Sequence, residues 1–252
     1  MHKPLIIGIG GAHSTVGKTT LSAAIIKHLT QHPTCFFSKK PRLGAIKYTR
    51  TELYASVIGD ELIIKQKDKD TARLAAAGAE KVLWIKSPRN KLEEPLSMAL
   101  SKLADLDGVV IEGNSAIEFV KPDIVIFICG ESKEYTKASA ITLMRQADIV
   151  IAQETASPIV GTAIRSTAKL FNLKDYPYIF DDQAIQDIIS LMKIIEKNKE
   201  IERLLKERSV GGKISCSLAR KIAEDLNVPY GDVGSTANQL KIKVKSCELG
   251  CF

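Results

Sequence analysis

The chain has 252 residues, of which 45% are hydrophobic and 26% charged, and its formal net charge is +7. This length suits one α/β domain with a small second module. The longest apolar run, residues 124–129, is far shorter than the roughly 20 residues of a membrane-spanning helix, and the N-terminus shows no signal-peptide core. The sequence therefore predicts a cytoplasmic protein without a membrane partner, and the mild positive charge favours an anionic ligand.

Short apolar runs alternate with helical patterns along most of the chain. The predicted strands cover residues 5–10, 35–37, 44–48, 81–86, 108–112, 122–129, 148–152 and 176–180. The predicted helices cover residues 18–29, 94–106, 137–146 and 182–197. Apolar, β-branched strands separated by helices are typical of an α/β fold, in which a mostly parallel sheet carries helices on both faces. Ligands of such sheets bind beyond the carboxyl ends of the strands.

The first strand runs into a loop whose sequence matches the phosphate-binding P-loop. The pattern is Gly-x-x-x-x-Gly-Lys-Ser/Thr, and Ala12 stands at its first position. In such a loop, backbone N–H groups and the start of the next helix bind phosphate oxygens. Lys18 is expected at the β- and γ-phosphates, and Thr19 is expected to bind Mg²⁺. The predicted nucleotide-binding residues are Ala12, His13, Ser14, Thr15, Val16, Gly17, Lys18, Thr19 and Thr20.

A carboxylate close to the Mg²⁺ ion completes a site of this kind. Glu112 ends the predicted strand 108–112, at the position where P-loop folds keep their metal-linked carboxylate. We therefore expect Glu112 to bind the metal and to act with Lys18 in catalysis, and Asp123 is a weaker candidate. No residue stands out as a water-positioning group, so the sequence predicts at most a slow GTPase or ATPase.

Four segments together resemble the molybdopterin-guanine dinucleotide biosynthesis protein B family. They are the P-loop, residues 45–49 (Ala-Ile-Lys-Tyr-Thr), residues 69–79 (Lys-Asp-Thr-Ala-Arg, then Ala-Gly-Ala) and residues 110–113 (Val-Ile-Glu-Gly). The resemblance implies a GTP-binding adapter of molybdenum cofactor maturation. It also implies that Lys47 and Asp70 lie near the γ-phosphate or the partner cofactor, and that the partner is a molybdopterin-type cofactor or a cofactor-synthesis protein. From the residues alone, Lys47 could equally be a solvated lysine and Asp70 a helix cap.

The chain departs from this family in ways that leave alternatives open. Tyr48-Thr49-Arg50 stands where the family has histidines, and no Asn-Lys-x-Asp motif follows the strand that ends at Ala152. The ligand is therefore GTP or ATP. The P-loop lacks the second lysine of the dimerising ATPases, although a homodimer stays open. An ATP-dependent ligase of the dethiobiotin synthetase type and a nucleotide-controlled transcription regulator are the alternative functions.

A basic stretch follows the second predicted strand. It contains Lys39, Lys40, Arg42, Lys47 and Arg50 with no acidic residue among them. One interpretation is a site for an anionic partner, such as a pterin phosphate, at the mouth of the P-loop. The other is a solvated basic loop.

The composition changes towards the C-terminus, and residues 1–198 and 199–252 are predicted to be separate domains. Residues 196–208 are highly charged and helical in pattern, and Gly211-Gly212 breaks that helix. Two helices over 215–226 and 230–240, a turn at 227–229 and a strand over 242–246 follow, which is helix–turn–helix spacing. Residues 199–252 carry 10 basic and 7 acidic residues, a modest excess for nucleic acid, so the sequence favours a protein-interaction or cofactor-sensing module.

Three cysteines gather in this C-terminal module: Cys216, Cys247 and Cys251. Three thiolates could bind Zn²⁺, another soft metal or an iron–sulfur cluster. A fourth ligand is not evident, and free thiols are the alternative interpretation.

Overall fold

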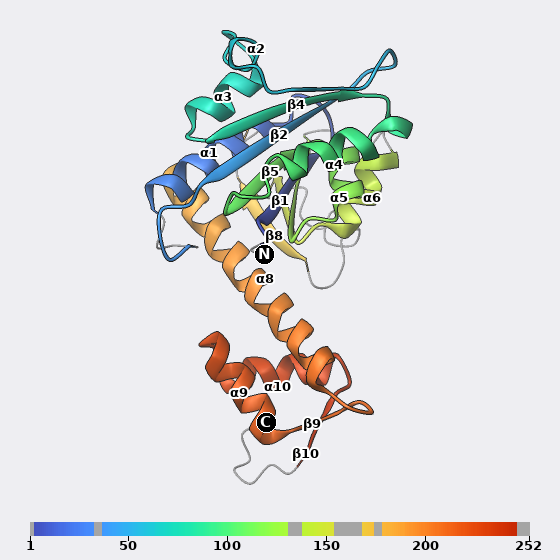
Figure 1. Cartoon of the computed structure of the whole chain (residues 1–252). Coiled ribbons are helices and arrows are strands. Elements are labelled where there is room, and N and C mark those ends of the chain that lie inside the picture. Colours follow the sequence, from blue (N-terminus) through green and yellow to red (C-terminus); the bar gives the residue numbers. More distant parts are fainter. Residues whose placement is uncertain (1–2, 33–36, 131–137, 154–167, 174–177, 246–252) are drawn as a thin grey trace. The chain divides into compact units, whose positions relative to one another are not determined.

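The computed structural model describes residues 3–32, 37–130, 138–153, 168–173 and 178–245 (Figure 1). The chain divides into two compact units, Met1–Met192 and Lys193–Phe252. The division falls inside one helix, α8 (Asp182–Arg208), which joins the two helical segments expected over 182–197 and 196–208. The domain boundary predicted from composition, after residue 198, falls within the same helix. In the described residues, no helix has the length and apolar character needed to cross a membrane.

The first unit contains an eight-stranded sheet with the order β3-β4-β2-β5-β1-β6-β7-β8. All neighbouring strands are parallel except β3, which pairs antiparallel with β4. The strands are β1 (Leu5–Gly11), β2 (Leu43–Arg50), β3 (Ser56–Ile58), β4 (Lys81–Ser87), β5 (Gly108–Glu112), β6 (Ile124–Ile128), β7 (Ile149–Gln153) and β8 (Lys169–Leu173).

Helices cover both faces of this sheet. The helices are α1 (Lys18–Gln31), α2 (Glu61–Ile64), α3 (Asp70–Ala76), α4 (Glu93–Ser101), α5 (Asn114–Val120) and α6 (Ala138–Gln146), with a 3-10 turn at Arg89–Lys91. Helices α1 and α3 contact each other and the sheet, whereas α4, α5 and α6 form a second contacting group. The central strands are buried on both faces, which explains their nearly continuous apolar sequences.

The predicted α/β fold is confirmed. The elements that the sequence analysis did not predict include the edge strands β3 and β8 and the helices α2 and α5. The prediction of a strand at 176–180 is wrong where it can be checked, because Tyr178–Phe180 has no strand conformation. The last strand of the sheet is β8 instead. Residues 174–177 lie outside the described residues, as do most of the residues of the strand expected at 35–37. Strand β8 escapes sequence analysis because its side chains are exposed or half-buried, so its sequence lacks an apolar run.

The second unit contains two short strands and two helices besides the end of α8. Strands β9 (Lys213–Ser215) and β10 (Lys243–Lys245) pair in parallel, and between them lie α9 (Cys216–Leu226) and α10 (Tyr230–Gln239). Half-buried Val244 of β10 packs against the buried core of this unit. That core consists of Ile201, Leu204, Leu205, Ile214, Ala219, Ile222, Ala223, Val233, Ala237 and Ile242. The predicted C-terminal helices are therefore confirmed, and β9 is an addition to the prediction.

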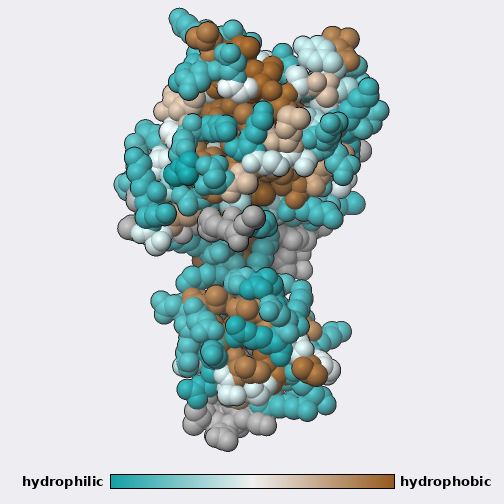
Figure 2. Space-filling view, in the orientation of Figure 1, coloured by the Kyte–Doolittle hydropathy of each residue, from teal (hydrophilic) through white to brown (hydrophobic). Residues whose placement is uncertain are grey.

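The surfaces of the two units are mostly hydrophilic on the face drawn in Figure 2. Hydrophobic side chains that lie in solvent occur after β2 and around α2, where Leu53 and Leu62 are more than four-fifths exposed. These residues lie outside the core that α4, α5 and α6 form against the sheet.

Candidate functional site

The loop between β1 and α1 has the geometry that the sequence predicts for phosphate binding. Gly17 adopts a left-handed conformation, with φ of 96° and ψ of 10°, directly before α1. A side chain there would be strained, so glycine is required by the backbone. Val16 is buried, whereas Ser14 and Thr15 are exposed. Ala12 is buried as well. The loop is therefore anchored by two apolar side chains, and it presents Ser14 and Thr15 to solvent.

Lys18 lies across the loop. Its ammonium donates hydrogen bonds to the carbonyl oxygens of His13 and, at 3.3 Å, of Ser14. The first helical turn contains no acidic residue, so nothing in that turn opposes the positive field of the helix N-terminus. The ammonium and this field together favour an anion at the loop.

A network of charged and polar groups joins the start of α1 to the ends of β2 and β5. Thr19 Oγ1 donates to Glu112 Oε2 at 2.8 Å, and Glu112 is only 2% exposed. The Lys47 ammonium forms an ion pair with Glu112 Oε1 and a second with Asp70 Oδ2 at 2.7 Å. It also lies 3.4 Å from Thr19 Oγ1. The structure thus brings Thr19, Lys47, Asp70 and Glu112 together, although they come from four different elements.

Parallel pairing explains why these residues meet. Lys47 on β2 is the direct partner of Glu112 on β5, and the two strands end at the same edge of the sheet. Asp70 is the first residue of α3. Partial burial acts to raise the pKa of Asp70, but the hydrogen bond and charge of Lys47, with Thr19 and Arg73, outweigh it, so its pKa is lowered from 3.8. Asp70 is therefore an anion at neutral pH.

The oxygen atoms of this network fit a magnesium ion. A hydroxyl and two carboxylates, from Thr19, Glu112 and Asp70, surround one positive group, the Lys47 ammonium. Mg²⁺ prefers hard oxygen ligands and keeps several waters. The donor set is therefore of the right kind, and Glu112 is the better placed carboxylate because it already accepts the Thr19 hydroxyl.

Asn114 is a structural residue of the site that the sequence analysis missed. Its side-chain amide bonds the backbone of Gly11 twice, accepting from the N–H and donating to the C=O, both at 3.0 Å. It therefore fixes the end of β1 where the phosphate loop begins. At the neighbouring Gly10, an added Cβ would lie 2.2 Å from Leu143 Cδ2, so a larger residue would force the buried Leu143 side chain to move. The sequence held one sign of this role, since Asn114 directly follows Glu112-Gly113 at the end of a predicted strand.

The structure contradicts one of the two interpretations of the basic stretch, a single anion site at the mouth of the P-loop, and also the weaker metal candidate Asp123. The basic stretch does not form one patch, because Arg42 precedes β2 at its amino end, where it pairs with Glu80 at 2.7 Å and Asp105 at 3.0 Å. Arg50, at the other end of β2, pairs with Glu52. Asp123 also lies at the amino ends of the strands, where it accepts from the backbone N–H of Ile6. It is therefore remote from the phosphate loop.

The predicted cysteine site gains no support. Cys216 is buried at the start of α9, while Cys247 and Cys251 lie outside the described residues. Among the residues with described positions, no group of three or more His, Cys, Asp or Glu side chains could hold a metal ion.

The fold and the loop geometry define a nucleotide-binding protein of the P-loop NTPase class. A comparison with known families identifies it further: residues 6–146 match the family Molybdopterin guanine dinucleotide synthesis protein B. The chain belongs to this family, which confirms the resemblance seen in the sequence. No curated protein sequence matches the chain.

The comparison with solved structures finds matches from several organisms. A plasmid partition protein of Borrelia burgdorferi B31 bound to AMPPNP is 12% identical, with a TM-score of 0.41, over 78% of this chain and 99% of that one. A ParA family ATPase of Chlorobium tepidum TLS is 12% identical, with a TM-score of 0.39, over 78% and 92%. A nucleotide-binding protein of Archaeoglobus fulgidus in complex with ADP is 12% identical, with a TM-score of 0.36, over 77% and 88%.

Proposed function

We propose that the chain is a nucleotide-binding adapter of molybdenum cofactor synthesis, which binds GTP or ATP with Mg²⁺ and hydrolyses it slowly. The observation that carries this proposal is the network of Thr19, Lys47, Asp70 and Glu112 directly beside the phosphate loop. Membership of the family supports the link to the molybdenum cofactor. The proposed nucleotide-binding residues are Ala12, His13, Ser14, Thr15, Val16, Gly17, Lys18, Thr19, Thr20, Lys47 and Asp70.

Each group of the network has a proposed task. Lys18 exchanges its carbonyl partners in the loop for the β- and γ-phosphate oxygens, where its charge favours phosphoryl transfer. Thr19 binds Mg²⁺ directly. Glu112 orients the Thr19 hydroxyl through the hydrogen bond that it already accepts from it. When bound, the metal supplies positive charge to the phosphates.

Lys47 is proposed to act as a counter-ion that moves. Its ammonium bridges the two carboxylates of Asp70 and Glu112. A divalent cation at these oxygens would compete with the ammonium for the same negative charge. Lys47 then becomes available to a phosphate or to an anionic partner cofactor, which ties the state of the nucleotide to partner binding.

A nucleotide titration tests the phosphate site. GTP and ATP are titrated with Mg²⁺ against the parent protein and the variant Lys18→Ala. Loss of one charge-assisted hydrogen bond of about 1.5–3 kcal/mol weakens binding by about 10- to 100-fold. The matched control is Lys65→Ala, which removes an exposed lysine that pairs with Glu61 at a helical spacing of four residues and leaves affinity unchanged. Equal affinity of Lys18→Ala and the parent would refute the site.

A second measurement tests the role in cofactor synthesis. Molybdopterin fluorescence is followed on addition of the protein, with and without nucleotide and Mg²⁺. We expect binding that depends on nucleotide and weakens in Lys47→Met. A ligase of the dethiobiotin synthetase type would instead release ADP only with a small carboxylate substrate, and that result would overturn the adapter role while leaving the nucleotide site intact.

A further inference from the structure

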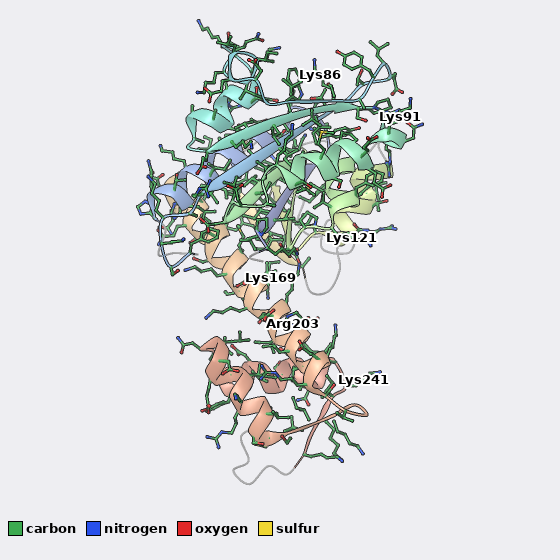
Figure 3. All side chains as sticks on the ribbon, viewed as in Figure 1. Lys86, Lys91, Lys121, Lys169, Arg203 and Lys241 are labelled. Atoms are coloured by element: carbon green, nitrogen blue, oxygen red, sulfur yellow. The ribbon has the colours of Figure 1, made fainter. Side chains whose placement is uncertain are left out.

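The second unit has a feature that the nucleotide site does not use: a group of lysines on the short sheet of β9 and β10 and in the turn directly before β10. We call Lys213, Lys241, Lys243 and Lys245 the lysine ribbon. Lys213 and Lys243 are direct partners across the parallel pair of strands, so both side chains leave the same face of the sheet. All members are exposed, and Figure 3 shows Lys241 pointing outward.

No described residue neutralises the lysine ribbon. The ion pairs described within residues 193–245 include those of Arg203, Lys206, Arg208 and Arg220, and none of them involves a lysine of the ribbon. Like charges directly opposite each other on a sheet are destabilising. The arrangement of Lys213 beside Lys243 therefore costs stability in the free protein, and a polyanion that contacts both ammonium groups would remove that cost.

Lys241 adds a second observation of the same kind. It has φ of 57°, a left-handed conformation in which glycine or asparagine is the usual residue. It directly follows the end of α10, where the N–H of Ile242 donates to the C=O of Ala237 at 2.8 Å. The backbone requirement of this helix end therefore favours glycine, yet a lysine stands there and carries its charge beside α10.

The unit around the ribbon is a helix–turn–helix. Helix α9 ends at Asn227 in a left-handed conformation, and α10 begins after Pro229. The last turns of α8 complete the core through Ile201 and Leu205. In Figure 1, α9 and α10 pack beside this end of α8. Strand β9 contacts α9, and β10 contacts both α9 and α10, so the short sheet lies against both helices of the motif. The second of these helices is the one that enters the major groove in proteins of this type.

The exposed face of α10 suits reading of base edges. Its exposed side chains include Asp232, Ser235, Asn238 and Gln239, with Val233 and Ala237 in the core. Asn and Gln pair with adenine, Asp accepts from cytosine, and Ser can bond either. This helix has no basic residue, so the phosphate contacts must come from elsewhere. Three members of the lysine ribbon, Lys241, Lys243 and Lys245, directly follow it in the chain.

We propose that the second unit binds double-stranded DNA, with α10 in the major groove and the lysine ribbon on the phosphates. This proposal goes beyond nucleotide binding and does not depend on the phosphate loop. An acidic protein surface is the competing polyanion. Such a surface would neutralise the charges of the lysine ribbon, but it would give no role to the side-chain amides of Asn238 and Gln239.

Salt dependence of DNA binding by the full chain is the test. With all members of the ribbon on phosphates, the slope rule predicts an affinity loss of about 150-fold between 50 and 200 mM salt, and about 12-fold when only two contacts remain. We therefore measure fluorescence anisotropy of a labelled 30-base-pair duplex with the parent and with Lys213→Gln/Lys243→Gln. The matched control, Lys206→Gln, removes an exposed lysine of the same unit that pairs with Glu202 and keeps the parental slope.

Lys241→Gly separates charge from folding. Glycine removes the left-handed strain, so the variant is at least as stable as the parent, while its DNA affinity falls and its salt slope drops by about one contact. Lys18→Ala leaves DNA binding unchanged, which keeps this test distinct from the nucleotide site. The proposal is overturned if the ribbon variants bind DNA with the parental slope, or if polyglutamate or single-stranded DNA of equal charge binds as tightly as the duplex.

Discussion

Replacement of Lys47 tests the electrostatic network directly, because this ammonium is the positive partner of a buried carboxylate. The change is Lys47→Met, which keeps the length of the apolar stem and removes the charge. Glu112 is 2% exposed and the Lys47 side chain 15% exposed, so the variant leaves a buried carboxylate with the Thr19 hydroxyl as its remaining hydrogen-bond donor in the network. Breaking a buried ion pair on one side costs about 3–5 kcal/mol.

The assay is urea unfolding at pH 7, followed by the fluorescence of Trp84, the chain's single tryptophan, which lies on β4 of the first unit. We expect a loss of about 3 kcal/mol, or about 1 M in the urea midpoint at a slope of about 3 kcal/mol/M. Lys65→Met, at an exposed pair, changes stability by less than about 1 kcal/mol.

A double variant distinguishes an unpaired charge from lost packing. Lys47→Met/Glu112→Gln removes both charges, so it recovers much of the stability that Lys47→Met loses. Two results would refute this reasoning. In the first, the double variant is less stable than Lys47→Met by the full cost of a second core substitution. In the second, Lys47→Met itself loses less than about 1 kcal/mol, which would show that Glu112 does not depend on this ammonium.

Three further predictions concern the same region. Asn114→Ala leaves the N–H and C=O of Gly11 without their side-chain partner and costs about 2 kcal/mol in urea unfolding, together with weaker nucleotide binding; unchanged values would show that water replaces the amide. Gly10→Ala, whose Cβ meets Leu143, costs about 1–3 kcal/mol, and Leu143→Ala in the same chain relieves part of the clash. Because the folded pKa of Asp70 lies below 3.8, its stabilisation is present above that value and is lost as pH falls through the lowered pKa. Asp70→Asn therefore differs from the parent by at most about 1 kcal/mol at pH 7, and the difference disappears at low pH.

Local patterns explain which parts of the site sequence analysis could find. Gly17, Lys18 and Thr19 are adjacent in the chain, and the requirements of a phosphate loop fall on consecutive residues. Glu112 was found because a parallel strand ends there. The roles of Lys47 and Asp70 were suggested only by resemblance, since their pairing depends on the packing of α3 beside the sheet.

Long-range pairing explains what sequence analysis could not find. Arg42 belongs to a run of basic residues, but its partners Glu80 and Asp105 are 38 and 63 residues away. A run of charges in the sequence therefore says little about the charge of the surface. Asn114 was missed for the same reason, because its two hydrogen bonds reach Gly11 over 103 residues.

The central place of β1 in the sheet has a consequence for synthesis on the ribosome. The strand that delivers the phosphate loop is hydrogen-bonded on one side to β5 and on the other to β6, which are translated more than a hundred residues later. A nascent chain that has exposed only β1, the loop and α1 lacks the neighbouring strands β5 and β6 that hold these elements in place. We expect ligand capture to begin only after β6 (Ile124–Ile128) has left the exit tunnel, so the earliest motif of the chain becomes competent only when about half of the 252 residues have been made.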